Sequence, residues 1–193
     1  MSPPIDFYYD FVSPYSYFAF AQRDEVRSRT GRTLDLKPVY VGAIMKEVGN
    51  APTSITCKAK RAYLGQDVGR WAVKLGVTVL SHPKFGFFST EPLIKAALRA
   101  GGDVEAFSVA AFAAVWVEQA PLDDLEAMSG WFARKDSRLA TYWDERETMA
   151  AALDERIAEA VSKGAFGVPY FSSEKGAFFG NDRIDFLVEA LAA

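Results

Sequence analysis

The sequence predicts an α/β fold in which a large all-helical insertion separates the two halves of a small sheet. Short apolar runs typical of buried strands occur near both ends of the chain, whereas helical periodicity dominates the middle. Of the 193 residues, 50% are apolar, which is enough to bury a proper core. We therefore expect one globular domain, or one domain with an insertion.

The chain opens with a predicted buried strand that is followed at once by a helix. Residues 5–11 are mostly apolar, rich in aromatic side chains and bounded by prolines. Ser13 is a good N-cap residue, and Pro14 is tolerated in the first turn because its missing N–H would be unpaired anyway. The apolar face of this helix continues to Arg29, and Gly31 ends it.

A second strand is predicted at residues 33–41, where apolar and polar residues alternate. Pro38 favours an edge strand or a bulge, because proline cannot donate to the hydrogen-bond ladder. The two strands and the helix between them form one β-α-β unit, whose strands should be parallel.

Residues 43–164 are predicted to be the all-helical insertion, because no convincing strand interrupts their helical periodicity. The expected helices are residues 57–75, 91–100, 104–118, 122–132, 137–143 and 149–163. The first of them carries apolar residues on or near one face, namely Tyr63, Leu64, Val68, Trp71 and Leu75. Such a face is typical of a helix that packs against a neighbour.

The tail of the chain returns to α/β character. Residues 168–172 and 177–179 are apolar runs separated by a turn-rich spacer, so a β-hairpin is expected. A final helix follows, capped by Asn181 or Asp182. The two ends can combine into one sheet with helices packed on it. This arrangement is the thioredoxin fold, with residues 1–42 and 165–193 as the thioredoxin-like domain.

The composition argues against several classes of function. Lys and Arg number 22 against 25 Asp and Glu, a formal charge of −3, so no global charge favours nucleic acid or an anionic membrane. No apolar run reaches the roughly 18 to 20 residues of a membrane span, and no secretion signal is recognisable, so we expect a cytoplasmic protein. Cys57, the only cysteine, rules out a dithiol couple, and with His82, the only histidine, it does not suffice for a metal site.

Three motifs connect the chain to a known family. "DFVSPYSY" opens the first helix, "FGVPYF" opens the tail hairpin and "GNDRID" opens the last helix. With these motifs in matching order and spacing, the chain resembles, over its whole length, the 2-hydroxychromene-2-carboxylate isomerase and kappa-class glutathione transferase family. The resemblance implies a thioredoxin domain with a helical insertion, glutathione as the cofactor, a small hydrophobic or aromatic substrate and a homodimer.

Ser13 stands where disulfide oxidoreductases of the same fold group carry the first cysteine of Cys-x-x-Cys. A serine hydroxyl needs an adjacent base to act as a nucleophile, and the spacing places none beside it. We therefore expect Ser13 to donate a hydrogen bond to the thiolate of glutathione, at a helix N-terminus that stabilises anions. The alternative for Ser13 and Pro14 is a plain helix cap, and Ser16 either assists or is an ordinary first-turn residue.

The resemblance also implies which residues hold glutathione. The backbone of Val168 would pair with the cysteinyl part, next to a cis Pro169 beside the first helix. The start of the last helix would hold the γ-glutamyl end, with Asp182 facing the ammonium. The alternatives are a strand-entry proline without a ligand and an ordinary Asn or Asp cap. The residues assigned to glutathione are Ser13, Pro14, Val168, Pro169, Gly180, Asn181, Asp182 and Arg183.

Lys46, Ser54 and Phe85 are assigned to the substrate. In the isomerases a lysine, an Asn-Arg pair and a tyrosine are thought to contact the aromatic carboxylate, and this chain has Lys46, Ser54-Ile55 and Phe85 at those places. The last two differ from the family pattern, so the identity of the substrate stays open.

Two further groups of residues have two interpretations each. A basic cluster is formed by Lys58, Lys60 and Arg61. In the first interpretation it binds an anion, which is a substrate or the glycyl carboxylate of glutathione, and in the second it is a solvated helix face. Trp71 and residues 85–88 either line an apolar pocket or belong to the core.

The leading hypothesis is a glutathione-dependent isomerase of 2-hydroxychromene-2-carboxylate-like aromatic substrates, with Ser13 as the catalytic residue. The alternatives are a kappa-type glutathione transferase and a non-catalytic thioredoxin-like binding protein. A serine hydrolase is disfavoured, because "FVSPY" lacks the G-x-S-x-G pattern and one histidine does not build a triad around Ser13.

Overall fold

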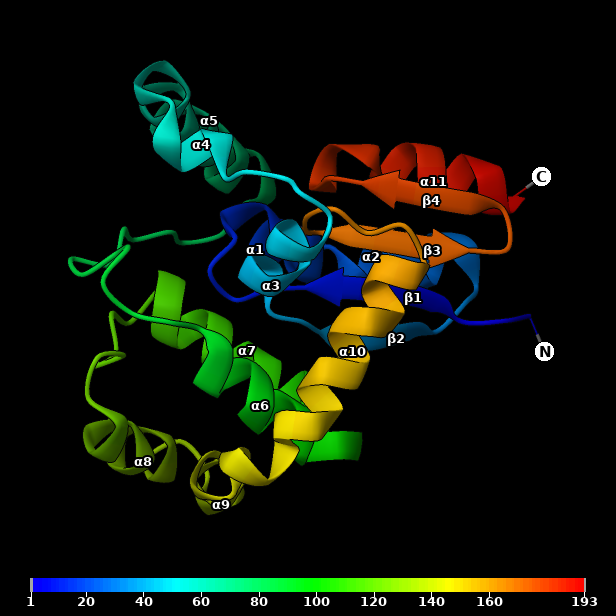
Figure 1. The fold of residues 1–193 in the computed structure, drawn as a ribbon. Coiled ribbons are helices and arrows are strands. Elements are labelled where there is room, and N and C mark those ends of the chain that lie inside the picture. The colour runs from blue at the N-terminus through cyan, green and yellow to red at the C-terminus, as the bar shows by residue number, and fades with distance from the viewer. Residues whose placement is uncertain (1, 193) are drawn as a thin grey trace.

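The computed structural model describes residues 2–192, apart from the side chains of residues 54 and 55. Within this range the strands form one sheet in the order β2-β1-β3-β4 (Figure 1). The strands are β1 (Ile5–Tyr9), β2 (Leu34–Pro38), β3 (Tyr170–Ser173) and β4 (Gly176–Phe179). β1 pairs in parallel with β2 and antiparallel with β3, and β3 pairs antiparallel with β4. The thioredoxin-like fold is confirmed, and Pro38 does lie on an edge strand.

The helices fall into two groups. The helices that come before or after the insertion in the sequence are α1 (Pro14–Ala21), α2 (Arg23–Thr30), the 3-10 turn η3 (Asn181–Arg183) and α11 (Ile184–Ala192). Those between β2 and β3 are α3 (Val41–Glu47), α4 (Thr53–Thr56), α5 (Lys58–Leu75), α6 (Glu91–Ala100), η1 (Gly101–Asp103), α7 (Val104–Trp116), α8 (Leu125–Ala133), α9 (Ser137–Asp144), η2 (Arg146–Met149) and α10 (Ala150–Ser162). Figure 1 shows α6 to α9 grouped on one side of the sheet and α10 running back to it. The large helical insertion is confirmed, whereas its limits at residues 43 and 164 stay a prediction.

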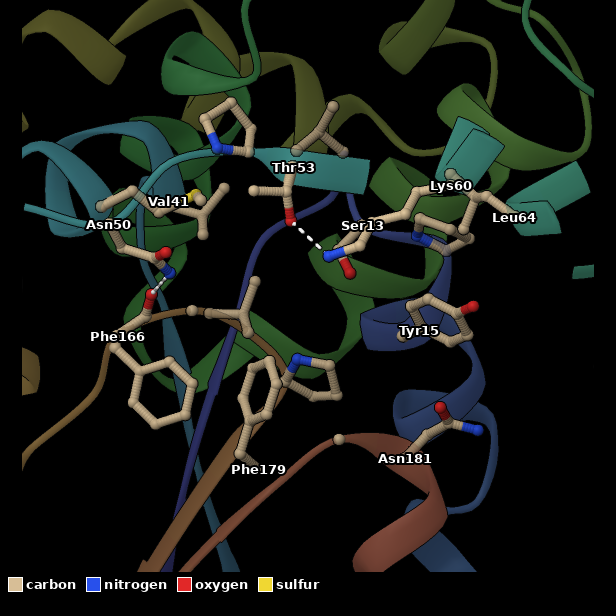
Figure 2. Close-up of a pocket in the computed structure, with 18 of the residues that line it drawn as sticks. Ser13, Tyr15, Val41, Asn50, Thr53, Lys60, Leu64, Phe166, Phe179 and Asn181 are labelled. Atoms are coloured by element: carbon tan, nitrogen blue, oxygen red, sulfur yellow. Dashed lines mark hydrogen bonds between the residues drawn. The ribbon is translucent and has the colours of Figure 1, made fainter. Parts of the chain in front are cut away.

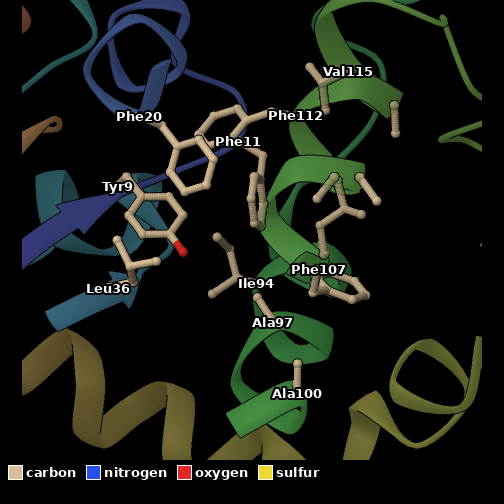
Figure 3. Packing of buried hydrophobic residues seen from close by; sticks show 14 of the residues in the cluster. Tyr9, Phe11, Phe20, Leu36, Ile94, Ala97, Ala100, Phe107, Phe112 and Val115 are labelled. Carbon is tan, nitrogen blue, oxygen red and sulfur yellow. The ribbon is translucent and has the colours of Figure 1, made fainter. Parts of the chain in front are cut away.

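The central strand β1 lies inside the core because its aromatic side chains pack against β3 and against α7 of the insertion. Phe7 stacks on Phe171 of β3, with ring centroids 4.6 Å apart. Tyr9 lies 5.8 Å from Phe112 of α7, again between ring centroids. Figure 3 shows Tyr9 and Phe112 together with Ile94 of α6, so the sheet and the insertion share one core. Each fully buried side chain of this size contributes about 1.5–3 kcal/mol to the free energy of folding. This packing holds the end of β1 in place, and the chain enters α1 from that end.

Glu105 of α7 connects the insertion to α2. It accepts hydrogen bonds from Arg23 Nε and from Arg27 Nη2, both at 2.6 Å. The hydrogen bond from Arg27, supported by Arg23, lowers the pKa of Glu105 to about 2 although burial opposes the shift. The carboxylate is therefore ionised at neutral pH, and the ion pairs persist there.

Two expectations about helices are wrong. The single helix expected up to Arg29 is broken at Gln22, which joins α1 to α2 with φ −90° and ψ 3°. Gln22 Nε2 donates to the carbonyl oxygen of Phe18 at 3.0 Å, so local hydrogen bonding satisfies the break. The pattern also missed α3 and α4. α3 begins at Val41, within the residues expected to form the second strand, and α4 has only 4 residues, too few for a periodicity.

The apolar residues of α5 do not form a buried face. Among the described residues of α5 none is buried, and the side chains of Tyr63 and Val73 are 58% and 85% exposed. The reason is that α4 and α5 stand apart from the rest of the insertion (Figure 1). Trp71 of α5 stacks beside Phe18 of α1, with ring centroids 6.4 Å apart. The inner side of α5 instead forms the wall of a cavity.

Candidate active site

The three sequence motifs meet at one cavity of about 630 Å³ (Figure 2). Ser13 lies at the start of α1, Val168 precedes β3 and Gly180 precedes η3. The cavity is lined by all the residues assigned to the cofactor, which are Ser13, Pro14, Val168, Pro169, Gly180, Asn181, Asp182 and Arg183. The peptide bond between Val168 and Pro169 is cis, as the resemblance implied. Residues from both ends of the chain therefore share one surface.

The residues assigned to the substrate are divided between two cavities. Phe85 lines the same cavity as Ser13. Lys46 lines a neighbouring cavity of about 360 Å³, and the two cavities share Val12 and Val41 in their walls. The side chain of Ser54 lies outside the described residues. Of the three, only Phe85 is brought to the cavity that Ser13 lines, within the described part of the chain.

Ser13 is held by its backbone and by its side chain. As the N-cap of α1 it has φ −89° and ψ 118°, and its Oγ accepts a hydrogen bond from the Ser16 N–H at 3.1 Å. Its own N–H donates to the Asp10 carbonyl oxygen, also at 3.1 Å. Among the described residues the Ser13 hydroxyl proton has no acceptor. The hydroxyl therefore accepts from the helix and has its proton free to donate into the cavity.

No histidine stands beside Ser13 as a base. His82 is 4% exposed and is not part of the cavity lining. One ring nitrogen, Nε2, lies 2.9 Å from the Ala120 carbonyl oxygen, and Nδ1 accepts the Lys84 N–H at 3.1 Å. His82 therefore fixes the loop that leads to Phe85, and nucleophilic catalysis of the Ser-His type has no support. Residues 2–192 with described side chains also hold no group of three or more His, Cys, Asp and Glu suited to a metal ion.

The corner of the cavity before α11 is built around a glycine. Gly180 has φ 104°, a conformation that favours glycine, and a Cβ at this position would collide with Asp182 Oδ1. Asn181 is 4% exposed, and its Nδ2 finds no hydrogen-bond partner among the described residues. Asp182 Oδ2 accepts a hydrogen bond from Arg183 Nη1 at 2.8 Å. This corner therefore offers an unused amide donor, a carboxylate and a guanidinium at the start of a helix.

One wall of the cavity comes from α5 and carries both polar and apolar groups. Figure 2 shows Lys60 and Leu64 on the side of Ser13. Lys60 Nζ donates to Thr53 Oγ1 at 3.1 Å and is paired with no carboxylate in the described part of the chain. Asp67 Oδ2 accepts the Tyr15 hydroxyl at 2.8 Å, which ties α5 to the first turn of α1. Burial and this hydrogen bond raise the pKa of Tyr15, so the phenol stays protonated.

The opposite wall is aromatic. Phe166 and Phe179 have ring centroids 4.6 Å apart and are 43% and 44% exposed. Asn50 Nδ2 donates to the Phe166 carbonyl oxygen at 2.8 Å, and Figure 2 shows this contact at the cavity rim. A Cβ on Gly167 would lie 3.1 Å from the Phe179 ring, so the absence of a side chain there lets the ring approach. This wall suits a flat or apolar group.

Sequence reasoning missed several of these lining residues. Phe166 belongs to the quoted motif "FGVPYF" and Tyr15 to "DFVSPYSY", so their positions were available as a signal. Asn50 and Thr53 carried none, because they come from a turn and from a short helix. Of the basic cluster only Lys60 lines the cavity, and of the apolar candidates Trp71 and Phe85 do, together with Leu64.

Comparison with known proteins assigns the family. Residues 4–192 match the family model described as DSBA-like thioredoxin domain, so the chain belongs to the DsbA-like thioredoxin family. A 2-hydroxychromene-2-carboxylate isomerase from Sphingobium xenophagum is 30% identical over 192 residues, which is 97% of each chain. Glutathione S-transferase kappa 1 from Caenorhabditis elegans is 26% identical over 207 residues, 98% of this chain and 91% of its own.

A solved structure agrees with the sequence comparison. The structure of a 2-hydroxychromene-2-carboxylate isomerase superimposes with a TM-score of 0.84 at 25% identity, and the match covers 98% of this chain and 95% of the other. The resemblance inferred from the three motifs is thereby confirmed. In residues 2–192 no helix combines the length and the apolar character needed to cross a bilayer.

Proposed function

We propose that this protein is a glutathione-dependent enzyme that isomerises 2-hydroxychromene-2-carboxylate-like aromatic substrates. The observation that carries the proposal is the Ser13 hydroxyl. It caps α1, accepts from the Ser16 N–H at 3.1 Å, and keeps its proton free over a cavity of about 630 Å³. The relatives named as 2-hydroxychromene-2-carboxylate isomerases and as a kappa glutathione transferase support an enzyme of this class.

The residues that line the cavity fit the polar groups of glutathione. The corner with Asn181, Asp182 and Arg183 offers donors and a carboxylate for the zwitterionic γ-glutamyl end. Asn181 Nδ2, which has no hydrogen-bond partner among the described residues, would donate to an oxygen of the ligand. The backbone of Val168 would pair with the cysteinyl part as an added strand does. Lys60, which has no carboxylate partner among the described residues, would face the glycyl carboxylate.

Ser13 contributes to catalysis by stabilising a thiolate. When bound, glutathione supplies the sulfur nucleophile that adds reversibly to the conjugated substrate. The Ser13 hydroxyl and the positive end of the α1 dipole lower the free energy of a sulfur anion relative to its thiol. A hydrogen bond to a charged group is worth about 1.5–3 kcal/mol and the helix terminus about 0.3–1 kcal/mol. Together they favour ionisation of the thiol at neutral pH.

One observation favours a second candidate, a kappa-type glutathione transferase. Leu64, Trp71 and Phe85 give the cavity an apolar wall, and Phe85 has no hydroxyl where the isomerases carry a tyrosine. A hydrophobic electrophile without a carboxylate fits this wall as well as a chromene does. In either case the enzyme would act as a homodimer in the cytoplasm on a small aromatic or hydrophobic molecule.

Turnover assays test the proposal directly. The protein should isomerise a chromene carboxylate only when glutathione is present, and glutathione should not be consumed. Consumption of glutathione with an aryl electrophile, and no isomerisation, would identify the transferase instead. If glutathione did not bind at millimolar concentration and no thiolate absorbance developed, the enzyme proposal would be wrong and a non-catalytic binding protein would remain.

A further inference from the structure

Asp10 is a carboxylate with no exposed surface, placed at the end of β1 and three residues before Ser13. Burying a carboxylate costs several kcal/mol unless hydrogen bonds or a cation compensate. No lysine or arginine compensates Asp10 within the described part of the chain, and hydrogen-bond donors do so instead. A chain that keeps an acid here therefore uses it for a purpose that an apolar residue would not serve.

The Asp10 carboxylate joins three segments of the cavity walls. Oδ1 accepts the Thr90 hydroxyl at 2.6 Å and the Val12 N–H at 3.0 Å. Oδ2 accepts the Val41 N–H at 2.8 Å. Val12 belongs to the turn into α1, Val41 begins α3 and Thr90 is the N-cap of α6. Val12 and Val41 line the Ser13 cavity, and all three line its neighbour.

The backbone of Asp10 completes the connection to Ser13. Its carbonyl oxygen accepts the Ser13 N–H at 3.1 Å, so the same residue holds Val12 through its side chain and Ser13 through its main chain. The direction of the Ser13 Cα–Cβ bond depends on the backbone of these two residues. Burial raises the pKa of Asp10, while the hydrogen bonds from Thr90, Val12 and Val41 oppose this shift.

Asparagine is a poor substitute at this position although it has almost the same shape. A carboxylate has two acceptor oxygens, whereas an amide has one oxygen and an NH₂ group. Because donors occupy both carboxylate oxygens, the NH₂ group of an asparagine side chain here would face either the Val41 N–H or the Val12 and Thr90 donors. At least one of the three segments would then be released.

We propose that Asp10 is a positioning residue that fixes the Ser13 hydroxyl toward the cofactor sulfur, acting through the Val12 N–H that its side chain holds and the Ser13 N–H that its carbonyl oxygen holds. Asp10 itself lines neither of the two cavities. The proposal deepens the function of Ser13 and rests on the proposed glutathione-dependent activity.

Three variants test the role of Asp10. Asp10→Asn replaces the acceptor-only group, and Thr90→Val keeps the charge but removes one donor. Ser108→Ala is the matched control, because Ser108 and Tyr9, the residue before Asp10, share a buried hydrogen bond of 2.7 Å and neither of them lines the two cavities. For each variant we would measure kcat, the KM for glutathione, the pH titration of the bound thiol by its ultraviolet absorbance, and the melting temperature.

The expected results distinguish a positioning role of Asp10 from an effect on protein stability and from an effect of its negative charge. Asp10→Asn should lower kcat about tenfold and raise the pKa of the bound thiol, with the KM for glutathione within about twofold, since tenfold corresponds to about 1.4 kcal/mol. Thr90→Val should shift both in the same direction by a smaller factor. Ser108→Ala should lower the melting temperature only. A lower thiol pKa in Asp10→Asn would mean that Asp10 acts by charge and would overturn the proposal. Unchanged kcat and thiol pKa in both Asp10→Asn and Thr90→Val would also overturn it, as a purely structural role.

Amide hydrogen exchange keeps the two proposals distinguishable. If the parent protein does not bind glutathione, the proposed function fails, and the positioning role is judged by exchange alone. Asp10→Asn and Thr90→Val should then speed exchange at the amides of Val12, Ser13 and Val41, while Ser108→Ala leaves these amides protected. Parent-like protection of these amides in Asp10→Asn would refute the positioning role whatever the activity.

Discussion

Ser13→Ala should leave glutathione bound and raise the pKa of its thiol. The substitution removes the hydroxyl whose proton is free for the cavity and also the Oγ that accepts the Ser16 N–H at 3.1 Å. A lost hydrogen bond to an anion costs about 1.5–3 kcal/mol, and one pKa unit corresponds to about 1.36 kcal/mol. The thiol pKa should therefore rise by about one to two units, and kcat at neutral pH should fall about tenfold or more.

The assay must separate the loss of the cap from the loss of the donor. Ser13→Gly does so, because glycine at an N-cap costs only a few tenths of a kcal/mol whereas alanine costs about 1 kcal/mol. Asp124→Ala is the control for a lost cap elsewhere, since Asp124 Oδ1 accepts the N–H groups of Glu126 and Ala127 at the start of α8. Ser13→Gly should match Ser13→Ala in kcat, and Asp124→Ala should lose stability alone.

Parent-like catalysis in both Ser13 variants would refute the donor role of Ser13. If Ser13→Ala and Ser13→Gly both kept the parent kcat and the parent thiol pKa, Ser13 would be a helix cap and no more. Ser13→Cys is a companion probe, because it would place a thiol at the N-terminus of α1, where a low thiol pKa is expected. Faster reaction with an alkylating reagent than at the exposed Cys57 would measure how strongly this terminus stabilises a sulfur anion.

Three further predictions concern the pH response and the cavity. Glu105→Gln should lower the free energy of unfolding by about 1 kcal/mol at neutral pH, because its arginine pairs are partly exposed and screened. The pKa of Glu105 is lowered from 4.5 to about 2, so this contribution is complete above pH 4.5 and is lost as the pH falls toward 2. Urea titrations in which the parent protein and Glu105→Gln differ equally at pH 2 and at pH 7 would contradict this prediction. Gly180→Ala should raise the KM for glutathione several-fold at nearly constant kcat, because a Cβ at a residue with φ 104° displaces Asp182. An unchanged KM would show that the γ-glutamyl end does not bind at the corner before α11. Lys60→Gln should raise the KM for glutathione about two- to fivefold but not that for glutathione ethyl ester, and an equal rise for both would assign Lys60 to the other substrate.

The parts of the fold that the sequence predicted well are those in which local pattern and core packing agree. The strand at residues 5–11 is read from its aromatic run, and the structure buries Phe7 and Tyr9 completely. The tail hairpin and the N-cap at Ser13 are read from local signals alone, namely a turn-rich spacer between apolar runs and a serine before a proline. The three motifs are local signals too, so their meeting at one cavity follows once the fold is known.

The parts that the sequence did not predict depend on the surroundings. The apolar residues of α5 have helical spacing, but spacing does not tell whether a neighbouring element covers them. Lys46 was assigned to the substrate by position in the chain, and its place in α3 directs it to the neighbouring cavity. Asn50 and Phe166 touch across a long sequence separation, which no pattern within a short window reveals.

The exposed state of α5 has a consequence for how the substrate range can change. A helix without a buried residue contributes little to the free energy of folding, yet Lys60, Leu64, Asp67 and Trp71 on this helix form part of the cavity wall. Substitutions of the apolar Leu64 and Trp71 should alter which molecules the cavity accepts at a small cost in stability, whereas Lys60 and Asp67 are bonded to Thr53 and Tyr15. Natural variation and directed evolution can therefore explore new substrates through α5 while the sheet and the helix that begins at Ser13 stay constant.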